Sequence, residues 1–186
     1  MAESHSVSRP VSGTDKTLTF STGVLAPQSQ GAVVVKIGGR KCTCGRRGCM
    51  EAYAGRGPME IHARHLVEKG HKTKLFEIME ERGRDRLTSG VWERALDHGD
   101  KLAEELMDEA LDALGAGVAS AVNLLDVEAV IIGGGLGVRF GEDGVKKIAK
   151  RMHPHLFVDE RPPAIEVAAL GDLGGAIGAS LLFDES

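Results

Sequence analysis

The stretch EAVIIGGGLG, residues 128–137, decides the fold of this chain. Its apolar run is short and rich in β-branched side chains, which is typical of a buried strand, and three glycines end it. A basic amphipathic helix is predicted to follow over about residues 144–153. A strand, a glycine-rich turn and a helix in this order indicate an α/β fold. The turn either brings the backbone close to a nucleotide or simply connects the strand to the helix.

Further strands and helices are predicted on both sides of this stretch. Residues 100–125 repeat apolar side chains at steps of three and four, which predicts a long helix. AVVVKI (32–37) and AIEVAAL (164–170) predict strands, and GGAIGASLLF (174–183) predicts a closing helix of small residues. Predicted short helices lie within 51–55, 58–70, 74–83 and 91–99. The expected architecture is therefore a small sheet with unusually many helices.

Composition and charge narrow the class of protein. The chain has 186 residues, of which 42% are hydrophobic and only 4% aromatic, and its formal net charge is -4. This balance argues against a basic field that recruits nucleic acid or an anionic membrane. No apolar run approaches the ~20 residues of a membrane helix, and the N-terminus lacks the apolar core of a secretory signal. We therefore expect a cytoplasmic protein that binds neither nucleic acid nor membranes.

The first 30 residues differ in composition from the rest. They are rich in Ser and Thr with interspersed Pro and Gly, and the only strand-like segment among them is TLTF at 17–20. Such a composition predicts a mostly disordered arm over residues 1–30. The folded domain is expected to occupy residues 31–186.

All three cysteines, Cys42, Cys44 and Cys49, lie within the stretch CTCGRRGCME, residues 42–51. Cytoplasmic thiols stay reduced, and clustered cysteines are there more often metal ligands than a disulfide framework. A tight turn with two glycines allows three thiolates to converge on a zinc ion at about 2.3 Å. A redox-active pair and thiols without a special role are the alternatives, although the spacing is not the Cys-x-x-Cys of redox proteins.

The residues of this loop resemble a known signature. CTCGRRGCMEAYAG (42–55) resembles the zinc-binding segment of the ROK family (repressors, open reading frames and sugar kinases) at every fixed position of Cys-x-Cys-Gly-x-x-Gly-Cys-x-Glu. NLLDVEAVIIGGGLG (123–137) and LGDLGGAIGASLL (170–182) are similar to the C-terminal segments of that family in kind and order. The resemblance covers residues 31–186. It implies the C-terminal part of an actin-like ATPase (ribonuclease H-like) sugar kinase fold.

The resemblance also implies roles for particular residues. Cys42, Cys44 and Cys49 match the thiol ligands of a structural zinc ion, and Glu51 matches a carboxylate that contacts sugar hydroxyls. The fourth ligand of the family is a histidine ten residues before the first cysteine, and Ala32 stands at that position. His62 or His65 could replace it, or the position could be left to water. The glycine triplet, Gly133, Gly134 and Gly135, matches a segment that lines the adenosine side of the cleft for ATP with magnesium.

Two parts of a family kinase do not occur in these 186 residues. They are the Asp-x-Gly-x-Thr phosphate loop, for which SGTDKT (12–17) is no substitute, and the Asn-Asp pair whose Asp is the general base. The resemblance implies ATP-dependent phosphorylation of a hexose, of the glucokinase or N-acyl-hexosamine kinase type. We expect this chain to be a fragment of such an enzyme, inactive by itself and able to form a homodimer. The alternatives are a non-enzymatic sugar-sensing half of a ROK-type regulator, a zinc-stabilised interaction module, and a truncated reading frame without a function.

Overall fold

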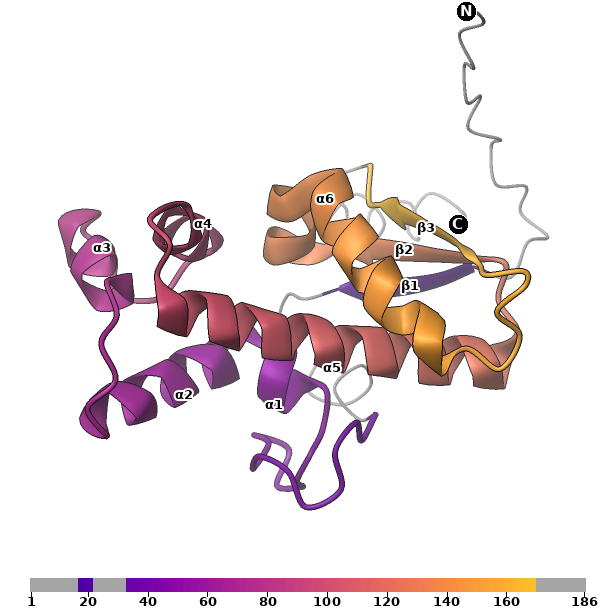
Figure 1. Ribbon diagram of the computed structural model, residues 1–186, viewed down its shortest axis with the longest axis horizontal. Helices are drawn as coiled ribbons and strands as arrows, with labels where there is room; N and C mark the ends of the chain where they lie inside the picture. The colour runs from indigo at the N-terminus through magenta and orange to yellow at the C-terminus, as the bar shows by residue number, and fades with distance from the viewer. Residues whose placement is uncertain (1–16, 22–32, 170–186) are drawn as a thin grey trace, which may run out of the picture.

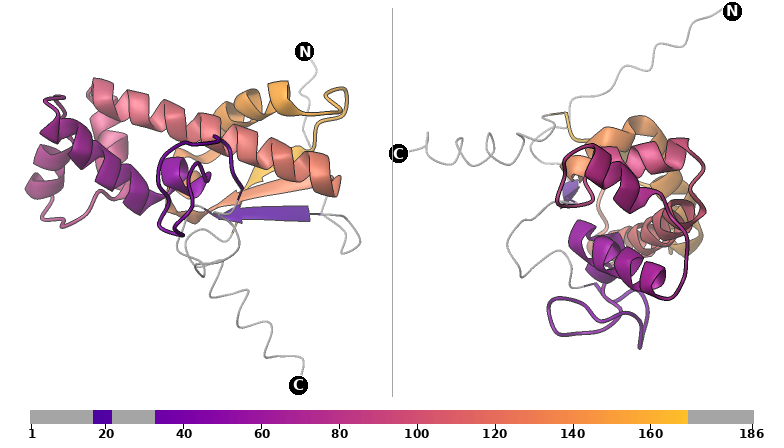
Figure 2. Two further views of the ribbon diagram at one scale, coloured as in Figure 1. Left: turned by 90° about the horizontal axis from the view of Figure 1, so that it is seen from below. Right: turned by 90° about the vertical axis from the view of Figure 1, so that its left-hand side faces the viewer.

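The computed structural model describes residues 17–21 and 33–169. Within them, three strands form one parallel sheet in the order β1-β2-β3, namely β1 (Thr17–Ser21), β2 (Ala129–Gly133) and β3 (Ala164–Val167). Helices α5 (Lys101–Leu125) and α6 (Gly134–Met152) lie on one face of this sheet (Figure 1; Figure 2). Parallel strands need a crossover, and α6 with the 3₁₀ turn His153–His155 supplies it between β2 and β3. The predicted α/β class and the small sheet with many helices are confirmed.

Strand β2 is the centre of the sheet because it is apolar throughout. Val130 and Ile132 are fully buried, and the strand pairs with β1 on one side and β3 on the other. A run without polar alternation is typical of a parallel strand that is covered on both faces. Helix α6 begins at once after Gly133, about ten residues earlier than the sequence predicts. The backbone leaves helical geometry at Gly141 (φ 51°, ψ -142°), and the predicted amphipathic helix is the part that follows this break.

Four short helices surround the first half of α5 in Figure 1. They are α1 (Glu51–Ala54), α2 (Arg56–Glu68), α3 (Leu75–Glu81) and α4 (Ser89–Asp97), all within the ranges predicted or a few residues from them. Trp92 of α4 is fully buried in the apolar cluster that these helices share with α5. The second half of α5 instead packs against α6, the sheet and the cysteine loop. The long helix therefore belongs to both halves of the core.

A buried carboxylate fixes the start of α5. Asp100 is the N-cap residue, and its Oδ1 accepts a hydrogen bond of 2.9 Å from the backbone N–H of Ala103. Its Oδ2 accepts from the Thr73 hydroxyl at 2.9 Å and from the Lys74 N–H at 2.5 Å. Asp100 therefore joins the beginning of α5 to the segment that leads into α3.

One predicted strand is wrong, and one observed strand was not predicted. Residues 32–37 do not form a strand where the structure describes them, because Val34 makes only a single bridge to Cys49 and the segment folds onto the cysteine loop. Thr17–Ser21, inside the range predicted to be a disordered arm, is strand β1, with each residue paired to β2. The short segment TLTF does not predict a strand by itself, and it becomes one because the open edge of the buried strand β2 provides a partner. The predicted closing helix at 174–183 lies outside the described residues.

The described helices include none that combines the length and the apolar character needed to cross a membrane.

Candidate metal loop and ligand sites

The three cysteine thiols converge in the folded loop. Every pair of their Sγ atoms lies within 4.8 Å, and the Sγ atoms of Cys44 and Cys49 are 3.7 Å apart. Ligands about 2.3 Å from a tetrahedral zinc ion are separated by about 3.8 Å, so this donor set fits zinc. In the described part of the chain the group contains these three residues alone, and neither His62 nor His65 joins it. Ala32 lies outside the described residues.

Glycines allow the loop to close. Gly48 has φ 77° and lies so near the preceding segment that a Cβ there would be 1.7 Å from the Lys36 carbonyl oxygen. Gly45 also has a positive φ, 87°, but a Cβ there would meet nothing within 4 Å. The Gly48 N–H donates to the Arg40 carbonyl at 2.8 Å, and the Gly45 N–H donates to the Cys42 carbonyl at 3.0 Å. These turns and hydrogen bonds bring the three thiols of the loop together.

The three thiols differ in their surroundings. Cys42 and Cys49 are buried, whereas Cys44 is exposed. Burial raises the pKa of the Cys49 thiol to about 11, and hydrogen bonds with the other two thiols act in the same direction. A hydrogen bond from the Arg46 backbone, with a second from Cys42, lowers the pKa of Cys44. Metal binding must therefore displace a proton from Cys49 at neutral pH.

The loop is anchored to α1 and α5 by side chains on both sides of the cysteines. The Arg40 guanidinium forms an ion pair with Glu109 of α5 and lies 4.7 Å above the centre of the Tyr53 ring. The Arg40 N–H donates to the Tyr53 hydroxyl at 3.0 Å. Met50 packs against α5 where Gly117 leaves room, since a Cβ at that position would lie 2.4 Å from the Met50 Sδ. The loop is therefore fixed to α1 and α5 by polar and apolar contacts.

Glu51 follows the loop directly as the first residue of α1. Its side chain is half-buried, and burial raises the pKa of its carboxyl group. The carboxylate lies over Gly55, where a Cβ would be 2.2 Å from Glu51 Oε1. Among the described residues no cation forms an ion pair with the Glu51 carboxylate. The arginines Arg40 and Arg64 pair instead with Glu109 and Glu60. A partly desolvated, unpaired carboxylate is a strong acceptor for ligand hydroxyl groups.

The glycine triplet lies away from the cysteine loop, at the end of β2 and the start of α6. Gly133 caps α6, and Gly134 and Gly135 form its first turn, whose N–H groups have no acceptor within the helix. In Figure 1 the cysteine loop lies below α5, whereas the start of α6 lies above α5. Glu51 thus lies next to the cysteine loop in sequence, and the triplet lies on the other side of α5.

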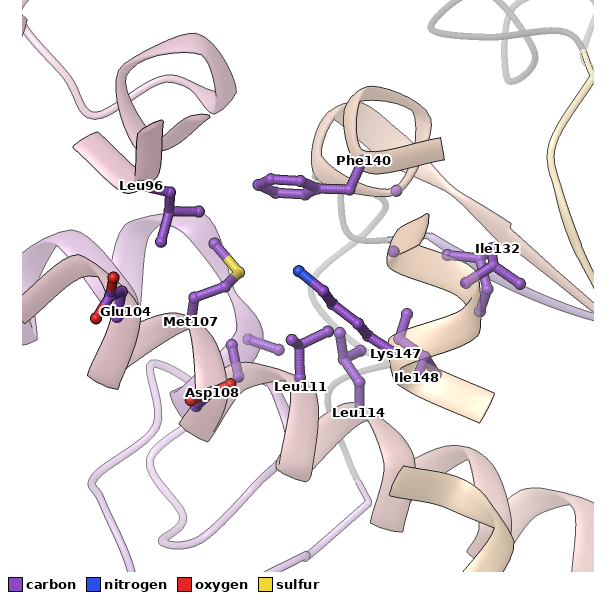
Figure 3. A pocket seen from close by; sticks show the side chains of 15 residues that line it. Leu96, Glu104, Met107, Asp108, Leu111, Leu114, Ile132, Phe140, Lys147 and Ile148 are labelled. Atoms are coloured by element: carbon purple, nitrogen blue, oxygen red, sulfur yellow. The ribbon is translucent and has the colours of Figure 1, made fainter. Parts of the chain in front are cut away.

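A cavity of about 350 Å³ lies beside the triplet, between α4, α5 and α6. Ile132 and Gly137, on either side of the triplet, form one wall, and apolar side chains form most of the rest. Figure 3 shows Phe140 at the top of the cavity and the Lys147 amine directed toward the space between Phe140 and Met107. This size and lining are typical of a small-molecule site. Sequence reasoning missed these residues because they come from four helices and a strand and form no motif.

The fold is that of the actin-like ATPases to which the ROK sugar kinases belong. A ROK family glucokinase from Streptomyces griseus, solved in complex with glucose and AMPPNP, has a TM-score of 0.69 and 26% sequence identity. The likeness covers 92% of this chain and 61% of that one. Residues 26–186 match the ROK family, and the chain belongs to it. The predicted family and fold are therefore confirmed.

Curated relatives add two sugar kinases. The kanosamine kinase of Amycolatopsis mediterranei (strain S699) is 32% identical over 152 residues, which are 82% of this chain and 45% of the relative. The N-acetyl-D-glucosamine kinase of Salmonella typhi is 29% identical over 144 residues, which are 77% of this chain and 41% of the relative. The chain thus spans less than half the length of these curated relatives.

Proposed function

We propose that this protein serves ATP-dependent phosphorylation of a hexose or N-acyl-hexosamine by supplying the metal-ordered sugar loop and one wall of the nucleotide site. The observation that carries the proposal is the half-buried carboxylate of Glu51, which has no ion-pair partner among the described residues and lies two residues after Cys49 in a loop whose thiols fit zinc. Sugar hydroxyl groups are donors that such a carboxylate can accept. The kinship with sugar kinases supports this assignment.

The metal loop has a structural role in this proposal. Zinc bound by Cys42, Cys44 and Cys49 would supply cross-links that hold the loop closed. Because Glu51 follows the last cysteine after one residue, closure of the loop would fix the start of α1 and with it the carboxylate. The chain's own contribution is therefore to position Glu51, and the metal takes no part in bond-making.

The nucleotide is assigned to the cavity between α4, α5 and α6. Its apolar walls suit a base and ribose, and the first turn of α6, with Gly134 and Gly135, suits the negative charge of phosphate groups. ATP with magnesium is the proposed phosphoryl donor. Phosphoryl transfer depends on positioning and on charge stabilisation around the phosphates. The 186 residues contain neither an Asp-x-Gly-x-Thr loop nor an Asn-Asp pair, so we propose that this polypeptide alone does not turn ATP over.

The setting of the protein completes the proposal. We place the protein in the cytoplasm, where the cysteine ligands of zinc stay reduced. The proposal also includes a homodimer formed through this half of the kinase fold. Neither nucleic acid nor membrane binding is part of the proposed function.

Sugar binding by the zinc-loaded protein tests the proposal. Titration calorimetry with glucose and with N-acetylglucosamine is expected to give saturable binding that Glu51→Gln weakens by about tenfold or more. Glu68→Gln, which changes an exposed carboxylate on α2, is the matched control and should leave binding unchanged. Absence of saturable binding to either sugar, or equal binding by the Glu51 variant, would refute the role of this carboxylate.

A further inference from the structure

A second groove of about 710 Å³ lies between residues 35–36, α1, α5 and the end of α6. Lys36, from the segment before the cysteine loop, and Tyr53 of α1 line one side, and Lys150 and Arg151 of α6 line the other. Tyr53 is two residues after Glu51 on the same helical turn, and positions two apart point to opposite sides of a helix. The groove is therefore separate from the proposed sugar contact at Glu51, and it shares no lining residue with the cavity beside the triplet.

Most charges around the groove are already balanced. Arg151 forms ion pairs with Asp108 at 2.5 Å and Asp112 at 2.7 Å, and Glu109 is paired with Arg40. These pairs leave the lysines of the two walls, Lys36 and Lys150, which have no ion-pair partner among the described residues. Both are exposed at the groove. An anionic group placed between them would therefore be attracted by two unneutralised ammonium groups.

The rest of the groove suits a hydroxyl-bearing body. Its floor on α5 is formed by the small residues Ala113 and Ala116, which leave space above them. Asp112 uses only Oδ1 in its bond to Arg151, and Glu109 uses only Oε2 in its bond to Arg40. The second oxygen of each carboxylate has no bond within the described residues and can accept from a hydroxyl group. A ligand that combines one compact anion with several hydroxyl groups matches this arrangement.

We infer that the groove binds a phosphate monoester of a sugar, with the phosphate between Lys36 and Lys150 and the hydroxyl groups on Asp112 and Glu109. The phosphate supplies the negative charge that would balance the two lysine ammonium groups. The sugar supplies donors for the two free carboxylate oxygens. The site lies on the opposite side of α1 from Glu51, so a sugar at Glu51 and a sugar phosphate in the groove can be bound together.

Calorimetric titration of the full-length, zinc-loaded protein with glucose 6-phosphate tests this inference. Saturable binding is expected, and Lys36→Met and Lys150→Met should each weaken it by about tenfold. Lys146→Met is the matched control, because Lys146 is an exposed lysine of the same helix that does not line the groove and pairs with Glu142 and Asp143. Binding in this control should equal that of the unchanged protein. Equal weakening in all three variants, or no binding at all, would overturn the inference.

Two further titrations identify the ligand and separate this site from the other. Inorganic phosphate is expected to bind more weakly than glucose 6-phosphate, and equal affinity would overturn the contribution of the hydroxyl groups. Glu51→Gln is expected to leave glucose 6-phosphate binding unchanged. If that variant instead loses glucose 6-phosphate together with glucose, both ligands occupy the Glu51 site, and the inference fails while the proposed function stands. If it loses glucose alone, both assignments are supported.

Discussion

Replacement of Gly48 by alanine is predicted to weaken zinc binding much more than the same change at Gly45. Both glycines have positive φ, which costs alanine about 1–2 kcal/mol in each case. A Cβ at Gly45 has open space, whereas one at Gly48 would lie 1.7 Å from the Lys36 carbonyl oxygen and would displace that backbone. The displacement would break the bonds from Val35 N–H and Lys36 N–H to the Gly48 carbonyl, now 2.8 and 3.1 Å. Two such bonds contribute about 1 kcal/mol each.

The expected penalties are thus about 1–2 kcal/mol for Gly45→Ala and about 3–4 kcal/mol for Gly48→Ala. Bound metal prevents the loop from relaxing, so the difference of about 2 kcal/mol should appear as about 30-fold weaker zinc binding by the Gly48 variant. Competition with a chromophoric chelator measures both affinities, and circular dichroism verifies that both variants fold. Equal affinities, or weaker binding by the Gly45 variant, would refute the reasoning from backbone contact.

Three other outcomes follow from the described contacts. Asp100→Ala removes an N-cap and two further bonds to a buried carboxylate, so the free energy of unfolding should fall by about 3 kcal/mol in chemical denaturation. Exposed Asp97→Ala should change it little, and similar losses in both would contradict the assignment. Burial raises the pKa of Glu51 in the folded protein, which therefore binds the proton more readily than the unfolded chain. Protonation of Glu51 should therefore increase the free energy of unfolding as the pH falls from neutral towards about 4.3, and Glu51→Gln should remove this increase. Denaturation curves of the variant with an unaltered pH dependence would contradict this role of Glu51. Because burial raises the pKa of the Cys49 thiol to about 11, zinc binding must release at least this proton, and zinc affinity should rise at least tenfold per pH unit near neutrality; pH-independent chelator competition would disprove a protonated thiol there.

The helices were predictable because their signals are local. The apolar repeat over 100–125 places α5 within one residue of its observed start, and Asp100 before it is a typical N-cap. The strand before the glycines was equally clear, since AVIIG is apolar in every position before its glycine. The start of α6 was missed because residues 134–140 contain several glycines and show no amphipathic pattern.

Local signals could not assign residues 17–21, which form a strand, or residues 32–37, which form none where they are described. AVVVKI has the composition of a strand, but its bonding partner is the cysteine loop rather than the sheet. TLTF is too short to predict a strand, and it becomes one because β2 offers an edge more than a hundred residues later in the chain. In both cases the outcome depends on which distant backbone lies alongside, and side-chain composition carries no such information.

The candidate sites divide in the same way. The three cysteines and Glu51 were predictable because the metal loop is contiguous in sequence, and the structure brings the thiols together as expected. The assignment of zinc and the roles of Glu51 and of Gly133, Gly134 and Gly135 stay predictions. The cavity beside the triplet and the groove with Lys36 and Lys150 join residues from separate elements. Such sites exist only once the chain has folded.

The length of α5 determines how the protein comes apart. Its 25 residues extend about 37 Å and contribute Leu102 and Leu106 to the helical cluster and Leu111 and Val118 to the cluster on the sheet. Neither cluster can lose its packing without exposing part of α5, so we expect the protein to melt in a single cooperative transition. The metal loop shares that fate through its anchorage on α5. A cavity created by truncating Trp92 should therefore weaken zinc binding, even though Trp92 belongs to the helical cluster and Cys42 and Cys49 belong to the cluster on the sheet.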